Sequence, residues 1–290
     1  MSPVAAKTAA QAKVNLFLRV LGKEQDGFHS IETLFLRLGL CDDVTVRITD
    51  LGRAIDCEGL EGVAPENNLA YRAAEAYSEA SGWPRGFSIE ITKRIPAGAG
   101  LGGGSSDAAA VLRILETLAA EPLGTQAILD ISRQLGSDIP FLASESAMAF
   151  AWGRGERMLA LDPLPKKPVL IAIPEFGVST ADAYAALDRA GSITSASHLS
   201  SVAELTSWQS VAASARNDFE GVVGAQHPDI PRLISTFKLA GAQISRMTGT
   251  GSAVFSIFDD TPLALPMMNS KVNLLTTLTA TSVVPVTVLD

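Results

Sequence analysis

A dense run of glycines near the middle of the chain has the composition of a phosphate-binding loop. Five glycines lie at positions 98, 100, 102, 103 and 104. Glycine tolerates positive φ and lets a bound group come close to the backbone. Ser105 and Ser106 follow and could cap a helix, whose free N–H groups and dipole would favour a bound phosphate. The apolar face of that helix is predicted at Ala108, Val111, Leu112 and Leu115.

The spacing of the loop argues against the common nucleotide motifs. Gly98, Gly100 and Gly103 satisfy G-x-G-x-x-G, but that fingerprint needs an acidic residue about 20 positions on, at the end of a second strand. Here the helix continues through that region. A Walker A loop would carry Lys where Gly104 stands. Residues 86–92 alternate between apolar and polar, so a half-buried strand leads into the loop and a flexible Gly/Ser linker is disfavoured.

Three segments together resemble the motifs of the GHMP small-molecule kinases. The glycine loop has the form Pro-x-Gly-x-Gly-Leu-Gly-x-Gly-Ser-Ser of the central motif. Residues 12–16 are similar to the first motif, and residues 247–255 to the third, a second glycine turn that runs into a strand. The resemblance implies ATP and Mg²⁺ as cofactors, with Asn68 and Lys93 beside the nucleotide and Ser106 as a contact for phosphate or metal. Asn68 could equally be a plain helix cap. The loop residues implied to bind ATP are Pro96, Ala97, Gly98, Ala99, Gly100, Leu101, Gly102, Gly103, Gly104, Ser105 and Ser106.

Residues 22–35 resemble one branch of these kinases more narrowly, the family that phosphorylates 4-diphosphocytidyl-2-C-methyl-D-erythritol in non-mevalonate isoprenoid biosynthesis. The resemblance implies that Phe28 stacks on the cytosine and that His29 hydrogen-bonds its edge. Such stacking contributes about 1–3 kcal/mol per base. The family usually has Tyr at the position of Phe28, so a hydroxyl is lost here. His29 could instead be a turn residue beside Asp26 and Gly27.

The same resemblance implies four further contacts to this substrate: Asn15, Tyr184, Gly249 and Thr250. Tyr184 would form the second wall around the cytosine. A tyrosine packed on a partly buried helix face would explain that residue equally well.

Residues 136–141 resemble the family segment that supplies the acidic residue of the active site. By that resemblance Asp138 is the general base for the substrate hydroxyl, and Lys13 lies beside it and favours the ionised carboxylate. Asp138 could alternatively cap a helix that begins before Pro140, and Lys13 could be a solvated lysine at the edge of an apolar strand. Because phosphoryl transfer passes through a loose transition state, positioning should contribute more than proton removal.

Composition limits the number of domains, the classes of binding partner and the cellular location that can be expected. The chain has 290 residues, 47% of them hydrophobic, which suffices for two domains with sizeable cores. A net charge of -8 gives no footprint for nucleic acid or an anionic membrane, so anionic substrates must be met by local groups. Cys41 and Cys57 form no motif and are expected to be reduced. The chain shows neither a signal peptide nor a long apolar run, so a cytoplasmic location is expected.

A proline-rich segment at residues 162–168 marks the predicted domain boundary, which gives an N-terminal nucleotide-binding domain at 1–162 and a C-terminal domain at 163–290. The mixed order of predicted strands and helices favours an α+β fold. The resemblance implies the two-domain GHMP kinase fold, with a ferredoxin-like second domain and the active site in the cleft between them. A monomer and a homodimer are both compatible with the sequence.

Two other functions stay open at this point. One is a GHMP kinase for another small alcohol, such as homoserine, mevalonate or a sugar, which would have no base for residues 28 and 29 to read. The other is a non-catalytic relative that binds a nucleotide, which would have no need of Lys13 and Asp138.

Overall fold

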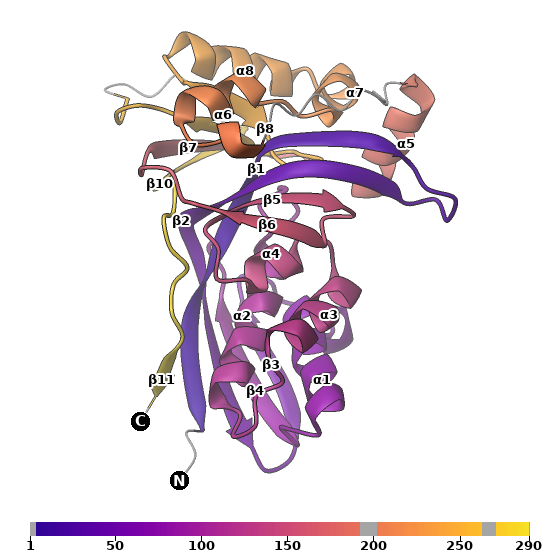
Figure 1. The fold of residues 1–290 in the computed structure, drawn as a ribbon, viewed down its shortest axis with the longest axis vertical. Coiled ribbons are helices and arrows are strands. Elements are labelled where there is room, and N and C mark those ends of the chain that lie inside the picture. The colour runs from indigo at the N-terminus through magenta and orange to yellow at the C-terminus, as the bar shows by residue number, and fades with distance from the viewer. Residues whose placement is uncertain (1–3, 192–201, 263–270, 290) are drawn as a thin grey trace.

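The computed structural model describes residues 4–191, 202–262 and 271–289. Within these residues the chain forms an elongated two-part structure, with one sheet in each part (Figure 1). The mixture of largely antiparallel sheets with helices packed on them confirms the predicted α+β class. The proline-rich segment connects the two sheets, because one strand ends at Leu161 and the next begins at Pro168.

The first sheet is built around two unusually long strands. Its central order is β11-β1-β2-β4-β3, and β5 pairs with β2 and β6. The strand β2 serves two partners in turn, since residues 31–36 pair with β5 and residues 43–49 pair with β4. The strands are β1 (Ala5–Lys23), β2 (His29–Thr49), β3 (Arg53–Glu58), β4 (Gly86–Thr92), β5 (Met148–Gly153), β6 (Arg157–Leu161) and β11 (Thr287–Leu289).

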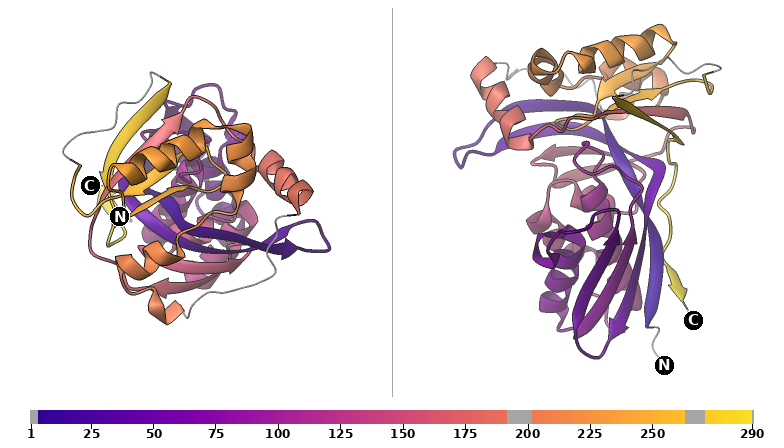
Figure 2. Two further views of the ribbon diagram at one scale, coloured as in Figure 1. Left: turned by 90° about the horizontal axis from the view of Figure 1, so that it is seen from above. Right: turned by 180° about the vertical axis from the view of Figure 1, so that it is seen from behind.

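Helices cover one face of this sheet, as the front and rear views show (Figures 1 and 2). The predicted alternation of β4 is confirmed: its apolar side chains are buried and Glu90 and Thr92 are exposed. The predicted apolar face of α2 is also buried in full. The helices are α1 (Leu69–Ser81), α2 (Gly103–Leu118), α3 (Thr125–Leu135) and α4 (Ile139–Ala143).

The expectation that Ser105 or Ser106 caps α2 is wrong. The N-cap residue is Gly102, with φ at 74°, and both serines lie inside the helix. Glycine adopts this left-handed conformation without a steric penalty, which lets the helix begin earlier than the serines suggest. The consequence is a helix N-terminus with no side-chain cap.

The second sheet has the order β10-β7-β9-β8, with helices packed on it. The strands are β7 (Pro168–Pro174), β8 (Ile244–Met247), β9 (Val254–Ile257) and β10 (Val272–Leu278), and the helices are α5 (Thr180–Ala190), α6 (Trp208–Ser214), α7 (Phe219–Gln226) and α8 (Asp229–Leu239).

The two parts are joined by more than the proline-rich segment. The hairpin of β1 and β2 extends beneath the second part (Figure 1), where Leu18 exchanges backbone hydrogen bonds with Arg216 and Asp218 at 2.8 and 3.0 Å. At the other end of the chain, β11 returns to the first sheet and pairs antiparallel with β1. The described N- and C-terminal residues therefore lie at the same end of the molecule.

The glycine loop also packs directly on the turn between β8 and β9. Ala253 N donates to Ala99 O at 3.2 Å, and the Thr248 hydroxyl donates to Gly100 O at 3.3 Å. A Cβ atom on Gly100 would lie 2.3 Å from Thr248 O. Glycine at this position is therefore required by the close approach of two backbones as well as by its φ of +80°.

A comparison of Gly100→Ala with Gly98→Ala should separate the cost of the close backbone approach from the cost of the positive φ. Gly98 also has positive φ, +68°, but nothing lies within 4 Å of a Cβ placed there. Gly98→Ala should lower the free energy of unfolding by about 1–2 kcal/mol, the cost of the backbone conformation alone. We expect Gly100→Ala to lower it by about 2 kcal/mol more, since the clash adds to that cost. Urea unfolding followed by circular dichroism measures both, and equal losses would contradict the packing described here.

Candidate active site

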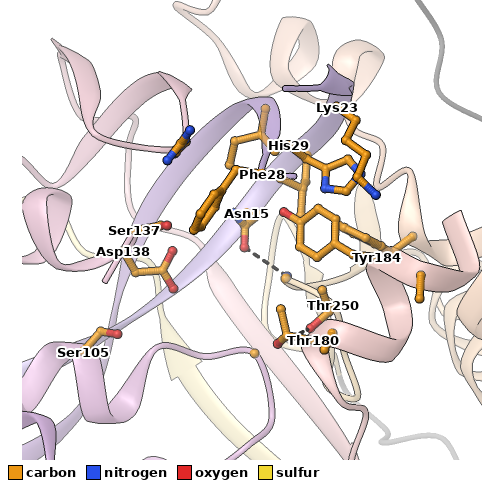
Figure 3. Close-up of a pocket in the computed structure, with 18 of the residues that line it drawn as sticks. Asn15, Lys23, Phe28, His29, Ser105, Ser137, Asp138, Thr180, Tyr184 and Thr250 are labelled. Atoms are coloured by element: carbon orange, nitrogen blue, oxygen red, sulfur yellow. Dashed lines mark hydrogen bonds between the residues drawn. The ribbon is translucent and has the colours of Figure 1, made fainter. Parts of the chain in front are cut away.

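A cavity of about 840 Å³ lies between the two parts of the molecule. Residues from both parts line it, and Figure 3 shows them converging from the hairpin, the helix starts and the β8–β9 turn. The first part contributes Lys13, Asn15, Phe28, His29, Gly100, Ser105, Ser137 and Asp138, and the second contributes Thr180, Tyr184, Asp188, Gly249 and Thr250. The three motifs found in the sequence thus meet at one cavity.

Lys13 and Asp138 form an ion pair at one end of this cavity. Lys13 Nζ lies 3.1 Å from Asp138 Oδ2 and donates to Asn15 Oδ1 at 2.9 Å. Lys13 is only 3% exposed, so it is not a solvated surface lysine. Asp138 does occupy the N-cap position of α4, but its side chain makes no capping hydrogen bond. Its carboxylate therefore faces Lys13 and the cavity.

Local backbone irregularities point the two β1 side chains into the cavity. The register between β1 and β2 shifts between Gln11 and Lys13 and again between Asn15 and Phe17. Bulges of this kind redirect side chains and are frequent beside functional sites. Lys13 and Asn15, two positions apart on one strand, consequently share a face of the sheet.

Arg37 holds the short helix that follows Asp138. Its Nη2 atom donates to the carbonyl oxygens of Phe141, Leu142 and Ser144 at 2.8–2.9 Å, and its Nε donates to Ser146 O. Phe141, Leu142 and Ser144 lie at the C-terminal end of α4, where a helix leaves carbonyl oxygens short of intrahelical partners. Burial lowers the pKa of Arg37 to about 9. Asp138 thus precedes the short helix α4, whose C-terminal end is held by Arg37.

The glycine loop presents backbone rather than side chains to the cavity. Ala99 and Leu101 are buried in the apolar core beneath the loop, whereas Gly100 and Ser105 line the cavity. The backbone hydrogen bonds of α2 begin with Ser106 N, which donates to Gly102 O at 2.8 Å. Because Gly102 has no side chain to cap α2, the first backbone N–H groups of this helix are available to an external acceptor.

Three residues expected at the nucleotide are engaged elsewhere. Ser106 is 2% exposed and its hydroxyl donates to Gln11 O at 2.6 Å. Asn68 caps α1 by accepting from Ala70 N at 2.9 Å, so it has the plain capping role that the sequence left open. Lys93 lies in a buried ion cluster. Of the two serines that follow the glycines of the loop, Ser105 is the one that lines the cavity.

Lys93 bridges two buried carboxylates behind the loop. Its Nζ lies 2.5 Å from Asp42 Oδ2 and 2.6 Å from Asp107 Oδ2. Asp42 also accepts from the backbone N–H groups of Arg94 and Ile95. One ammonium cannot neutralise both acids, and burial together with the charge of Asp42 raises the pKa of Asp107 to about 7. Lys93 therefore supports the start of α2, where Gly103 packs against it.

Phe28 lies at the opposite end of the cavity from the loop. Its ring is 58% exposed and stacks on the Arg154 guanidinium, whose carbon is 4.1 Å from the ring centre. Arg154 also forms ion pairs with Glu24 and Asp26, so it ties the tip of the β1–β2 hairpin to the end of β5. One face of the Phe28 ring is held by this cation.

His29 and Tyr184 stack on each other beside Phe28. Their ring centres are 4.7 Å apart, and Tyr184 also meets Phe219 edge-on at 4.8 Å. His29 Nε2 is 2.6 Å from Asp188 Oδ1. Burial and the charge of Asp138 raise the pKa of Tyr184 to about 12, so this ring stays neutral. The expected second wall therefore lines the same cavity as Phe28, with His29 against it (Figure 3).

Asn15 joins the first motif to the third. Its Oδ1 accepts from Gly249 N at 3.0 Å and lies 3.2 Å from the Thr248 hydroxyl, and its Nδ2 donates to the Thr33 hydroxyl at 2.8 Å. Thr250 lies at the rim, where its hydroxyl is 3.1 Å from that of Thr180. Asn15 thus fixes the β8–β9 turn against β1, and Gly249 and Thr250 line the cavity beside it.

Sequence reasoning gave no role to several residues that shape the site, among them Lys23, Arg37, Arg154 and Asp188. For Asp188 a signal existed, since it lies four residues after Tyr184 and so on the same helix face. The partners of Arg37 and Arg154 lie more than 100 residues away along the chain. No spacing in the sequence could have revealed those pairs.

The described residues contain no group of three or more His, Cys, Asp or Glu side chains placed to hold a metal ion. None of their helices is long and apolar enough to span a membrane. Both cysteines are free, and burial raises the pKa of each, that of Cys41 to about 11, which agrees with unreactive thiols.

Two family models match the chain in order along the sequence. The model described as GHMP kinases N terminal domain matches residues 68–149, and the model described as GHMP kinases C terminal matches residues 201–265. A homoserine kinase from Cytophaga hutchinsonii shares the fold with a TM-score of 0.70 at 17% identity, covering 100% of this chain and 98% of that chain. The fold and the cavity together are those of a GHMP kinase.

More similar relatives define the family within that class. A protein of Solibacter usitatus named 4-diphosphocytidyl-2-C-methyl-D-erythritol kinase is 40% identical over 88% of this chain and 82% of its own length, and one of Geobacter sp. is 39% identical over 87% and 89%. A crystal structure of 4-(cytidine 5'-diphospho)-2C-methyl-D-erythritol kinase matches with a TM-score of 0.78 at 33% identity, covering 94% of this chain and 98% of that chain. This chain belongs to the family of the 4-diphosphocytidyl-2-C-methyl-D-erythritol kinases.

The buried cluster around Lys93 should make stability depend on pH. The folded chain holds the Asp107 proton up to about pH 7, whereas an unfolded chain releases it near about pH 4. Between these values the folded state binds more protons, so the free energy of unfolding should fall as pH rises. Asp107→Asn removes this titration. We expect the wild type to lose stability relative to Asp107→Asn between pH 5 and pH 8.

Urea midpoints at the two pH values measure this difference. Asp130→Asn, which removes an exposed carboxylate from α3, serves as the control and should track the wild type. A constant offset between wild type and Asp107→Asn at both pH values would contradict a proton held on the buried acid.

Proposed function

We propose that this chain transfers the γ-phosphoryl group of ATP to the 2-hydroxyl of 4-diphosphocytidyl-2-C-methyl-D-erythritol, with Asp138 as the general base and Lys13 as its partner. The observation that carries this proposal is the Lys13–Asp138 pair, 3.1 Å apart, in a cavity that also reaches the start of α2. The family membership of the chain supports the choice of substrate.

The glycine loop fits the triphosphate. A phosphate at the start of α2 would meet uncapped N–H groups and the positive end of the helix dipole, and the glycines leave room for it. Lys93 does not contact the phosphates in this account. It forms ion pairs with Asp42 and Asp107 behind the loop, which lowers the negative charge close to the helix start.

Mg²⁺ would enter with the nucleotide. Magnesium in phosphoryl-transfer sites is commonly held by phosphate oxygens, waters and one or two protein ligands, so a dense acidic cluster is not needed. Ser105, whose side chain lines the cavity, fits such a contact better than Ser106, which donates to Gln11. When bound, the ion supplies positive charge to the transferring phosphoryl group.

The chain's own residues would then move one proton. The substrate hydroxyl approaches the Asp138 carboxylate, and its proton passes to a carboxylate oxygen as the new oxygen–phosphorus bond forms and the bond between the γ-phosphorus and ADP breaks, so that ADP leaves. Lys13 keeps one N–H beyond its contacts with Asn15 and Asp138, and that donor can orient the hydroxyl or the phosphoryl oxygens. Since both groups are anchored, most of their contribution lies in alignment.

The aromatic end of the cavity fits the cytidyl group. Phe28 offers an exposed face for stacking, and Tyr184 and His29 lie beside it. The diphosphate would then bridge the base end and the catalytic end. The nucleotide site would then lie in residues 1–162, and the second wall of the substrate site in residues 163–290.

Replacing Asp138 tests the catalytic assignment. Asp138→Asn keeps the shape of the side chain but removes its basicity, so kcat should fall by about 10²-fold or more with little change in KM for either substrate. A coupled assay of ADP release measures both parameters. Asp130→Asn, far from the cavity on the surface of α3, should leave them unchanged.

A panel of acceptors tests the substrate. The wild type should turn over 4-diphosphocytidyl-2-C-methyl-D-erythritol and leave homoserine, mevalonate and galactose untouched. Turnover of one of those alcohols instead would overturn the choice of substrate. ATP binding without turnover of any acceptor would identify a nucleotide-binding protein that is not a kinase.

A further inference from the structure

Asp188 connects the base end of the cavity to the second part of the molecule. It lies on α5, and its two carboxylate oxygens have different partners: Oδ1 is 2.6 Å from His29 Nε2, and Oδ2 is 2.7 Å from Lys23 Nζ. His29 and Lys23 are opposite each other at the turn end of the β1–β2 hairpin, where they pair in register. Figure 3 shows Lys23, His29 and Tyr184 gathered on one side of the cavity.

The carboxylate determines which nitrogen of His29 carries the proton. The hydrogen bonds from Lys23 and His29 hold the pKa of the Asp188 carboxyl below its usual value, so this group is an acceptor only. His29 Nε2 must therefore donate. In the neutral ring the proton is then on Nε2, and Nδ1 keeps its lone pair. Nδ1 makes no hydrogen bond to any residue in the described ranges, and His29 lines the cavity.

Lys23 compensates the charge of that carboxylate. The ammonium of Lys23 lies on its second oxygen and supplies a counter-charge, so the carboxylate is not an unpaired charge beside the imidazole. His29 itself is well shielded, with a side chain only 7% exposed, and Tyr184 covers one face of its ring.

We infer that Asp188 and Lys23 are positioning residues that fix His29 as a hydrogen-bond acceptor at Nδ1 and thereby make the site select cytosine over uracil. This inference rests on the proposed function and specifies how its base is read. Cytosine carries an amino group at C4, which donates, whereas uracil carries a carbonyl oxygen there, which accepts. The Nδ1 lone pair of His29 can accept a hydrogen bond from the amino group of cytosine. Against the carbonyl oxygen of uracil it would face another lone pair, and the two would repel each other. Rejection of this kind can exceed the gain from the correct contact.

The Asp188→Asn variant tests the inference without changing the size of the side chain. An amide can accept from Nε2–H or donate to an Nε2 lone pair, so it no longer imposes one tautomer on His29. The preference for the cytidyl over the uridyl form of the substrate, as a ratio of kcat/KM values, should fall by at least about tenfold, mainly through KM. Asp182→Asn, on the exposed side of the same helix, loses the same charge and should keep the wild-type ratio.

A second measurement reads the tautomer directly and needs no turnover. The chain contains three histidines, so two-dimensional ¹H–¹⁵N spectra of histidine-labelled protein are simple to assign, with His29→Gln identifying the signals of His29. The wild type should show a proton on Nε2 and a bare Nδ1. In Asp188→Asn the spectrum should shift toward a mixture or toward protonated Nδ1.

The outcomes separate this inference from the proposed function. A wild-type spectrum with protonated Nδ1, or an unchanged preference in Asp188→Asn, would overturn the inference even if the kinase activity is as proposed. If the activity were absent, calorimetric binding of cytidine 5′-diphosphate and uridine 5′-diphosphate to the same variants would decide it. Equal affinity of the wild type for the two nucleotides would then contradict the inference.

Discussion

The structure depends on the close contact between the glycine loop and the turn that joins β8 to β9. Gly100 lies so near Thr248 that no other residue fits there, and Asn15 hydrogen-bonds the same turn from β1. This contact places three distant segments of the chain in one rigid frame. Without it the phosphate end and the base end of the cavity would belong to two parts joined mainly by the hairpin and the proline-rich segment. The chemistry proposed here requires these two ends at a fixed separation.

Around this frame, buried charges fall into two groups. Lys93 and Arg37 are held by protein acceptors, two carboxylates in one case and four carbonyl oxygens in the other. Leaving such a charge unpaired would cost several kcal/mol, so these residues support the fold. Lys13 differs, because its carboxylate partner Asp138 has a side chain that is 30% exposed and opens to the cavity. A paired but accessible acid is the arrangement that a general base requires.

The sequence predicted the local elements well where periodicity was strong. The strand before the loop, the apolar face of α2 and the three motifs required only short-range patterns. Long-range pairings could not be predicted from it. The pairing of β11 with β1 and the hydrogen bonds from Arg37 to α4 join residues that are far apart in the chain. Ser106 and Lys93 show what residue type leaves open. Both types suit a phosphate, but in the folded chain their polar groups have protein partners. Residue type indicates which chemistry is available, and only the fold decides which of those groups remain free.

A crystal structure with a non-hydrolysable ATP analogue and 4-diphosphocytidyl-2-C-methyl-D-erythritol would show whether the loop and Asp138 have the proposed roles. We expect the polyphosphate against the backbone of residues 98–106, the 2-hydroxyl within hydrogen-bond distance of Asp138, and the cytosine against Phe28. A polyphosphate bound away from residues 98–106, or a hydroxyl that faces no carboxylate, would contradict these roles.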